Sequence, residues 1–135
     1  MYSLKQARKE FFKRLLMSDL YQEIVLEHAE HPHNFGALSG ATHTVKDANA
    51  SCGDLIELQL KVEKGIIKEV KWRGVGCAIS TASASILTDL IQGKTLQEVK
   101  RLTTQDLLKE MGMTTILPTR EKCVHLPLRV LQKAE

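Results

Sequence analysis

Residues 55–73 read LIELQLKVEKGIIKEVKWR, and this stretch decides the fold. In its first half, Leu58 and Leu60 alternate with polar residues, which is the pattern of a half-buried strand. The second half alternates in the same way around Trp72. A Lys-Gly pair at 64–65 separates the halves and is typical of a tight turn. We therefore predict an antiparallel hairpin.

Helical patterns lie on either side of this hairpin. Residues 78–91 are rich in alanine and serine, with an apolar residue every three or four positions, and predict a helix packed closely against the sheet. Capping residues and glycine or proline stops predict further helices at 18–29, 95–102, 104–112 and in a last segment ending near Ala134. A third strand is predicted at 42–48. The expected fold class is α+β, with a small antiparallel three-stranded sheet packed against helices.

Composition narrows the possible functions. The chain has 135 residues, of which 43% are hydrophobic, and fits one domain with a single core. No apolar run approaches the roughly 20 residues of a membrane-spanning helix, so no membrane partner is expected. The net charge is +3, but residues 1–16 hold five basic residues and one acidic residue, which leaves −1 for the rest. A nucleic-acid partner is therefore not expected.

Residues 1–16 form a predicted basic helical N-terminal extension, followed by a domain at 17–135. An amphipathic basic helix of this kind can bind a surface or serve as a targeting leader. A peripheral helical arm, or a start codon upstream of a natural beginning at Met17, accounts for the same pattern. These interpretations stay open.

The chemistry is concentrated in three cysteines, Cys52, Cys77 and Cys123. Together with Asp54 they offer three soft thiolates and one carboxylate, enough donors for a tetrahedral metal site. An odd cysteine count argues against a disulfide framework and favours a reducing, cytoplasmic setting. The wide spacing between them leaves a second interpretation open, in which they are simply buried core thiols.

The predicted elements suggest how each donor is presented. Cys77 should lie at the N-terminal end of its helix, where unpaired amides favour a thiolate. Cys123 is predicted to precede the last helix, with Lys122 beside it favouring the same charge state. Pro127 supports that helix start, because proline is tolerated only in a first turn. Cys52 is two residues from its carboxylate partner in an extended segment, so both side chains should point to one face.

Several other residues could bear on this site. Lys122 could pair with Asp54 or stabilise a thiolate, or it could be a solvated surface lysine. His125, two residues past Cys123, could supply an imidazole or face elsewhere on the helix. Three neighbouring histidines, His28, His31 and His33, suggest a metal patch by their density, but a helix end followed by a loop accounts for them.

Residues 27–36, EHAEHPHNFG, resemble the "H-x-x-x-P-x-N-x-G" segment of the U-type iron–sulfur cluster assembly family, which comprises the IscU, SufU and NifU amino-terminal scaffolds. Three further motifs follow in the order of that family: Cys52-Gly53-Asp54, Gly76-Cys77 and Lys122-Cys123. The resemblance covers residues 19–134 and implies the IscU/SufU-like α+β fold.

The resemblance implies a scaffold that takes sulfur as persulfide from a cysteine desulfurase, completes a transient [2Fe–2S] cluster with iron, and passes it to apo iron–sulfur proteins. Cys52, Asp54, Cys77 and Cys123 would be the ligands of the cluster or of zinc. An alternative is a zinc-dependent sulfurtransferase with Cys52 and Cys123 as the candidate catalytic residues, so enzyme activity is left open. A structural zinc module that docks partners through its hairpin is a third possibility. The ligand set suits a monomer or a weak homo-oligomer.

At two places the sequence departs from the IscU pattern of this family, and both affect whether the chain resembles the IscU or the SufU branch. Lys122 stands where IscU-type members have histidine, and residues 120–123 resemble the "R-x-K-C" of the SufU branch, although the insertion typical of that branch is absent. The chaperone-recognition "L-P-P-V-K" of IscU is replaced by Leu117-Pro118-Thr119-Arg120, so transfer assisted by an Hsp70 chaperone is not expected.

Overall fold

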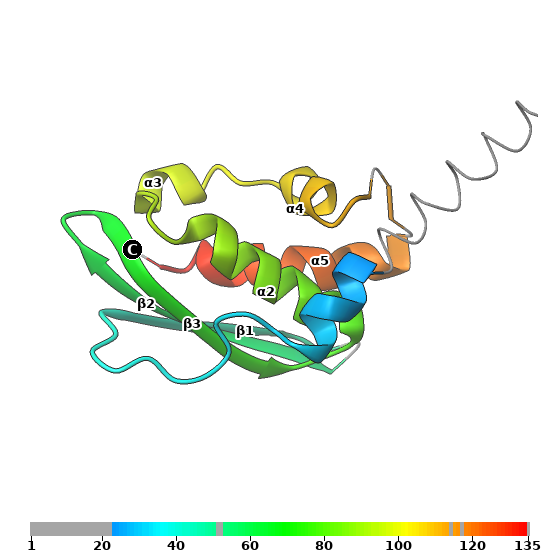
Figure 1. The fold of residues 1–135 in the computed structure, drawn as a ribbon, viewed down its shortest axis with the longest axis horizontal. Coiled ribbons are helices and arrows are strands. Elements are labelled where there is room, and N and C mark those ends of the chain that lie inside the picture. The colour runs from blue at the N-terminus through cyan, green and yellow to red at the C-terminus, as the bar shows by residue number, and fades with distance from the viewer. Residues whose placement is uncertain (1–22, 51–52, 114, 117, 135) are drawn as a thin grey trace, which may run out of the picture.

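The computed structural model describes residues 23–50, 53–113, 115–116 and 118–134 (Figure 1). Its sheet has three antiparallel strands in the order β1 (His43–Asn49), β2 (Asp54–Glu63) and β3 (Ile66–Val75). The predicted hairpin, third strand and α+β class are confirmed. The predicted extension at 1–16 lies outside the described residues.

The hairpin turn has the backbone that its sequence suggests. Lys64 and Gly65 have φ values of 52° and 76°, and positive φ at both central residues matches the right-handed twist of the flanking strands. Leu58 pairs with Trp72 across the hairpin, and both side chains are buried. The alternation therefore places one face of the sheet in the core and the other in solvent.

Helices cover the core face of the sheet (Figure 1). They are α2 (Ala78–Ile91), α3 (Leu96–Val99), α4 (Thr104–Glu110) and α5 (Pro118–Leu131). The helices α2 and α5 pack against the sheet and each other, and residues 23–30 form a further helical segment beside α2. Small buried residues on α2 allow the close approach, and Ser83 Oγ donates to the Val124 carbonyl at 2.9 Å. No helix among the described residues is long and apolar enough to cross a membrane.

Two predicted helix boundaries are wrong. The last helix begins at Pro118, so Cys123 lies inside it and Pro127 lies in its interior. A proline in a helix interior destabilises the helix by about 3 kcal/mol. Burial of one leucine side chain stabilises the fold by about 1.5–3 kcal/mol, and α5 buries several apolar side chains, including Leu126 and Leu128. Tertiary burial therefore outweighs the local penalty. The sequence pattern predicts Thr104 as the cap of α4, but the N-cap is Thr103, which forms a capping box.

The outer edge of β3 is covered at both ends by returning chain. Near one end, Trp72 donates its backbone N–H to the Asn34 carbonyl and accepts from the Gly36 N–H, both at 2.9 Å. Its indole Nε1 donates to the His33 carbonyl at 2.9 Å. Near the other end, Ile67 N–H donates to the carbonyl of residue 94. These bonds fix the loop after residues 23–30 against the sheet.

An ion pair connects β1 to α5 and makes a testable contribution to stability. Asp47 accepts hydrogen bonds from the Ala48 N–H at 2.8 Å and from Arg129 Nε at 2.7 Å, and these partners lower the pKa of Asp47 below 3.8. A carboxylate whose pKa is lowered by folding stabilises the fold at pH values above its pKa in the unfolded chain. That contribution is lost as the pH falls through its pKa in the folded protein.

We therefore expect Asp47→Asn to lower the free energy of unfolding near neutral pH, and the difference from the wild type to shrink as the pH falls below 3.8. Urea unfolding over a pH series measures both effects. Glu63→Gln is the control, because its pair with Lys61 is exposed and 3.8 Å long and should contribute little. A difference that persisted unchanged at low pH would show that the ion pair is not its cause.

Candidate metal centre

Three of the four predicted ligands meet at one end of the sheet. Asp54 is the first residue of β2, Cys77 is the N-cap of α2, and Cys123 lies in α5. One ligand atom from each lies within 4.8 Å of the other two. Cys52 lies outside the described residues, so its predicted place in the site and the face to which it points stay predictions.

The carboxylate of Asp54 is buried and held by the start of α2. Ser80 Oγ donates to its Oδ2 at 2.8 Å, and the Cys77 backbone N–H donates to its Oδ1 at 3.3 Å. A buried carboxylate is costly unless it is hydrogen-bonded, so these two contacts explain how Asp54 is tolerated at 2% exposure. They also fix the carboxylate beside the sulfur atoms.

Cys77 has the thiolate-favouring environment that the sequence predicts. Burial raises the pKa of the Cys77 thiol, but hydrogen bonds from the Ser80 side chain, from the backbone amides of Ser80 and Ile79 and from Cys123 outweigh burial and lower the pKa overall. The Ser80 hydroxyl lies 3.3 Å from Cys77 Sγ. A lowered pKa favours the thiolate, which is the form of cysteine that acts as a nucleophile or binds a metal.

The expectation for Cys123 is wrong in the metal-free protein. Its side chain is 2% exposed in the interior of α5, and burial, followed by the neighbouring Cys77, raises the pKa of Cys123 to about 12. Lys122 is exposed, so its charge does not overcome the desolvation. A metal ion at this site would have to displace the Cys123 proton.

The glycine before Cys77 is required by the packing of the site. A Cβ at Gly76 would lie 2.8 Å from Asp54 Oδ1 and 2.9 Å from the Ser80 Cβ. Sequence reasoning missed Ser80. The available signal was its position in the sequence. Ser80 lies three residues after the predicted helix start at Cys77, and a side chain at that spacing points back toward the start of the helix.

A cavity of about 530 Å³ opens beside Cys77 and is lined mainly by apolar side chains, among them Ile79, Met113 and Ile116. Two exposed apolar residues at the paired ends of β2 and β3, Leu55 and Val75, lie next in sequence to the site. Of the two cysteines that the structure describes, Cys77 opens onto an apolar surface, whereas Cys123 is buried.

His125 is directed away from the sulfur atoms. Its Nδ1 lies 3.2 Å from Thr104 Oγ1 on α4, which agrees with the interpretation that it faces elsewhere. Two thiols and a carboxylate that converge in a buried position suit a thiophilic ion, because Zn²⁺ and iron accept thiolate and carboxylate donors together. Asp54, Cys77 and Cys123 would hold such an ion, with Cys52 as the predicted fourth donor.

The fold and these donors define a small α+β domain with two thiols and a carboxylate gathered at one end of its sheet, where they could hold a metal ion. Residues 20–134 match the NifU-like N terminal domain family, and the chain belongs to that family.

Two relatives of this chain carry different functional names. The iron–sulfur cluster assembly scaffold protein IscU of Streptococcus pyogenes serotype M1 is 33% identical, and the alignment covers 87% of this chain and 84% of the relative. The zinc-dependent sulfurtransferase SufU of Bacillus subtilis (strain 168) is 30% identical, and the alignment covers 87% of this chain and 90% of the relative. The crystal structure of FiSufU, a protein of the SUF system of Fervidobacterium islandicum AW-1, superimposes with a TM-score of 0.71 at 26% identity and covers 85% of this chain and 96% of that one.

Proposed function

We propose that this protein is an iron–sulfur cluster assembly scaffold. It accepts sulfur from a cysteine desulfurase, assembles a [2Fe–2S] cluster and transfers it to apo iron–sulfur proteins. The observation that carries the proposal is the convergence of Asp54, Cys77 and Cys123 within 4.8 Å, in a family whose members include named scaffolds.

The described thiols suggest a division of roles. Cys77 is half-buried, has a lowered pKa and opens onto the apolar cavity, so it is the described thiol that an incoming donor can reach. In a sulfur transfer, a thiolate attacks the terminal sulfur of the desulfurase persulfide, a new S–S bond forms and the desulfurase cysteine leaves as thiolate. Iron and a separate one-electron donor are then needed to reduce the transferred sulfur to sulfide.

The buried Cys123 suits the role of ligand better than that of nucleophile, because its thiol has a raised pKa. The carboxylate of Asp54 is a harder donor than its thiolate neighbours, which suits a cluster that has to be released. The ligand thiols also need a reducing compartment, so we propose a cytoplasmic location.

The second candidate is a zinc-dependent sulfurtransferase, which the same donor set also supports. Zn²⁺ takes the same tetrahedral thiolate and carboxylate ligands, and a relative that matches nearly the whole chain is named for this activity. In this alternative Cys52 accepts the persulfide while zinc orders the site.

Anaerobic incubation of the full chain with a cysteine desulfurase, cysteine, ferrous iron and an electron donor separates the two candidates. We expect visible absorption of a cluster and a native mass increase of two irons and two sulfides, followed by transfer to an apo-ferredoxin. If the protein instead retained zinc, gained one sulfur and formed no cluster, the scaffold proposal would be rejected in favour of the sulfurtransferase. A desulfurase inactivated at its own cysteine is the control for chemical sulfide.

A further inference from the structure

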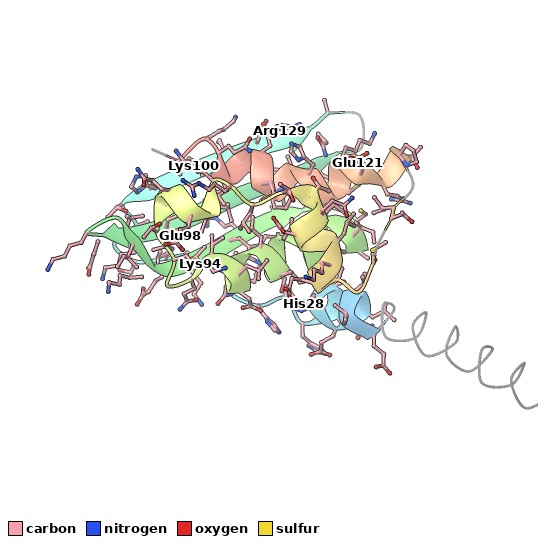
Figure 2. All side chains as sticks on the ribbon, turned by 90° about the horizontal axis from the view of Figure 1, so that it is seen from above. His28, Lys94, Glu98, Lys100, Glu121 and Arg129 are labelled. Atoms are coloured by element: carbon pink, nitrogen blue, oxygen red, sulfur yellow. The ribbon has the colours of Figure 1, made fainter. Side chains whose placement is uncertain are left out.

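A second group of metal-ligating side chains lies outside the cysteine centre. His28 of the helical segment, His33 of the following loop and Asp89 of α2 each place one ligand atom within 4.8 Å of the others. The two imidazole rings have centroids 4.4 Å apart. Figure 2 labels His28 on this segment, beside α2.

This cluster is separate from the cysteine centre, although α2 contributes to both. Cys77 caps the start of α2, and Asp89 lies twelve residues later. A rise of about 1.5 Å per residue puts the two positions about 18 Å apart along the helix axis. One ion cannot contact both groups.

Partner side chains orient two of the three groups. His28 Nδ1 lies 2.7 Å from Ser85 Oγ, which also accepts the backbone N–H of His33 at 2.8 Å. Asn34 Nδ2 donates to Asp89 Oδ1 at 2.9 Å. Outer hydrogen bonds of this kind, to the second nitrogen of a histidine and the second oxygen of a carboxylate, fix ligands in metal sites.

In the metal-free protein the side chains of His33 and Asp89 bond to each other. His33 Nδ1 and Asp89 Oδ2 are 2.6 Å apart, with both side chains nearly half exposed. Ligand atoms of a tetrahedral Zn²⁺ site with bonds of about 2.0–2.1 Å are about 3.3 Å apart, so small side-chain rotations would admit an ion in place of the shared proton. Burial, and then His33, lower the pKa of His28, which is the direction that favours the neutral, metal-binding form of the ring.

We propose that His28, His33 and Asp89 form a second metal site that binds a divalent first-row transition ion such as Zn²⁺ or Fe²⁺. Two imidazole nitrogens and one carboxylate oxygen, without thiolate, suit these ions and not Ca²⁺ or Mg²⁺. The exposure of two ligands leaves room for water on the ion. The site does not rest on the proposed scaffold function.

Cobalt distinguishes this site from the cysteine centre. Co²⁺ bound by thiolate gives sulfur-to-metal charge transfer in the near ultraviolet, whereas Co²⁺ bound by imidazole and carboxylate gives only weak visible bands. We titrate the full reduced chain with Co²⁺, follow both signals and count bound ions by native mass spectrometry. The expected result is a second equivalent that binds without charge transfer.

Two variants remove different ligands of the site, so that a folding defect in one does not leave the question open. His33→Gln and Asp89→Asn should each weaken the second equivalent by at least about tenfold and leave the charge-transfer signal unchanged. His31→Gln is the matched control, because His31 is an exposed neighbour outside the cluster. Circular dichroism checks the fold of each variant. A wild type that takes up only the thiolate-bound ion, or a second equivalent unaffected in both variants, would overturn the proposal.

Discussion

Replacing Cys77 with serine is expected to abolish retention of zinc or of a cluster during gel filtration, with an affinity loss greater than about 100-fold. Loss of an outer hydrogen bond alone costs about 10–100-fold in metal affinity, and Cys77→Ser removes a donor atom. The fold should persist, because the side chain is only half-buried and serine is a favoured residue at the N-cap position that Cys77 occupies. Competition with a chromogenic zinc chelator measures the affinity.

Ser80→Ala is the comparison variant for Cys77→Ser, because it should weaken metal binding by a smaller factor. It keeps every thiol and the carboxylate but removes the 2.8 Å bond to Asp54 Oδ2 and the 3.3 Å contact with Cys77 Sγ. We expect a loss of about tenfold, at the low end of the outer-bond range. If Cys77→Ser bound zinc as tightly as Ser80→Ala, Cys77 would not be a ligand.

Replacing Gly76 with alanine is expected to damage the metal centre by steric displacement alone. The new methyl group would lie 2.8 Å from Asp54 Oδ1, so the carboxylate or the start of α2 has to move. Overpacking of this kind costs about 1–3 kcal/mol in stability. A displaced carboxylate should also weaken metal binding by about tenfold or more.

Gly93→Ala is the matched control for that substitution. Gly93 has φ +87° with open space around its Cβ position, so alanine there meets backbone strain of about 1–2 kcal/mol but no clash. The control should lose stability and keep its metal affinity, whereas Gly76→Ala should lose both. Thermal unfolding paired with chelator competition separates the two. Equal affinity in both variants would show that Gly76 does not protect the position of Asp54.

The sheet was predictable because its signal is local. The alternation around Leu58 and Trp72 has a period of two, and only a hairpin buries both sets of side chains on one face. The start of α5 was not predictable in this way. The penalty of Pro127 is visible in the sequence, but the compensation comes from burial against α2 and the sheet, which depends on residues far away along the chain.

The candidate site likewise has features that the local sequence predicts and features that depend on tertiary packing. Asp54 and Cys77 could be placed at the ends of a strand and a helix, and these ends do converge. The raised pKa of Cys123 could not be foreseen, because desolvation by the packed core exceeds the effect of a basic neighbour in sequence. The histidine cluster was visible only as density near residue 30. Its carboxylate, Asp89, is 56 residues away from His33.

The two segments that bond to the outer edge of β3 affect how readily a second copy of the chain could pair with that strand. An open strand edge is a template on which a second copy can add a strand, and such edges drive aggregation. Here the backbone groups of Trp72 and Ile67 are already bonded within the chain, at opposite ends of that edge. Strand addition along β3 would therefore have to break bonds that the folded chain already makes at these two positions.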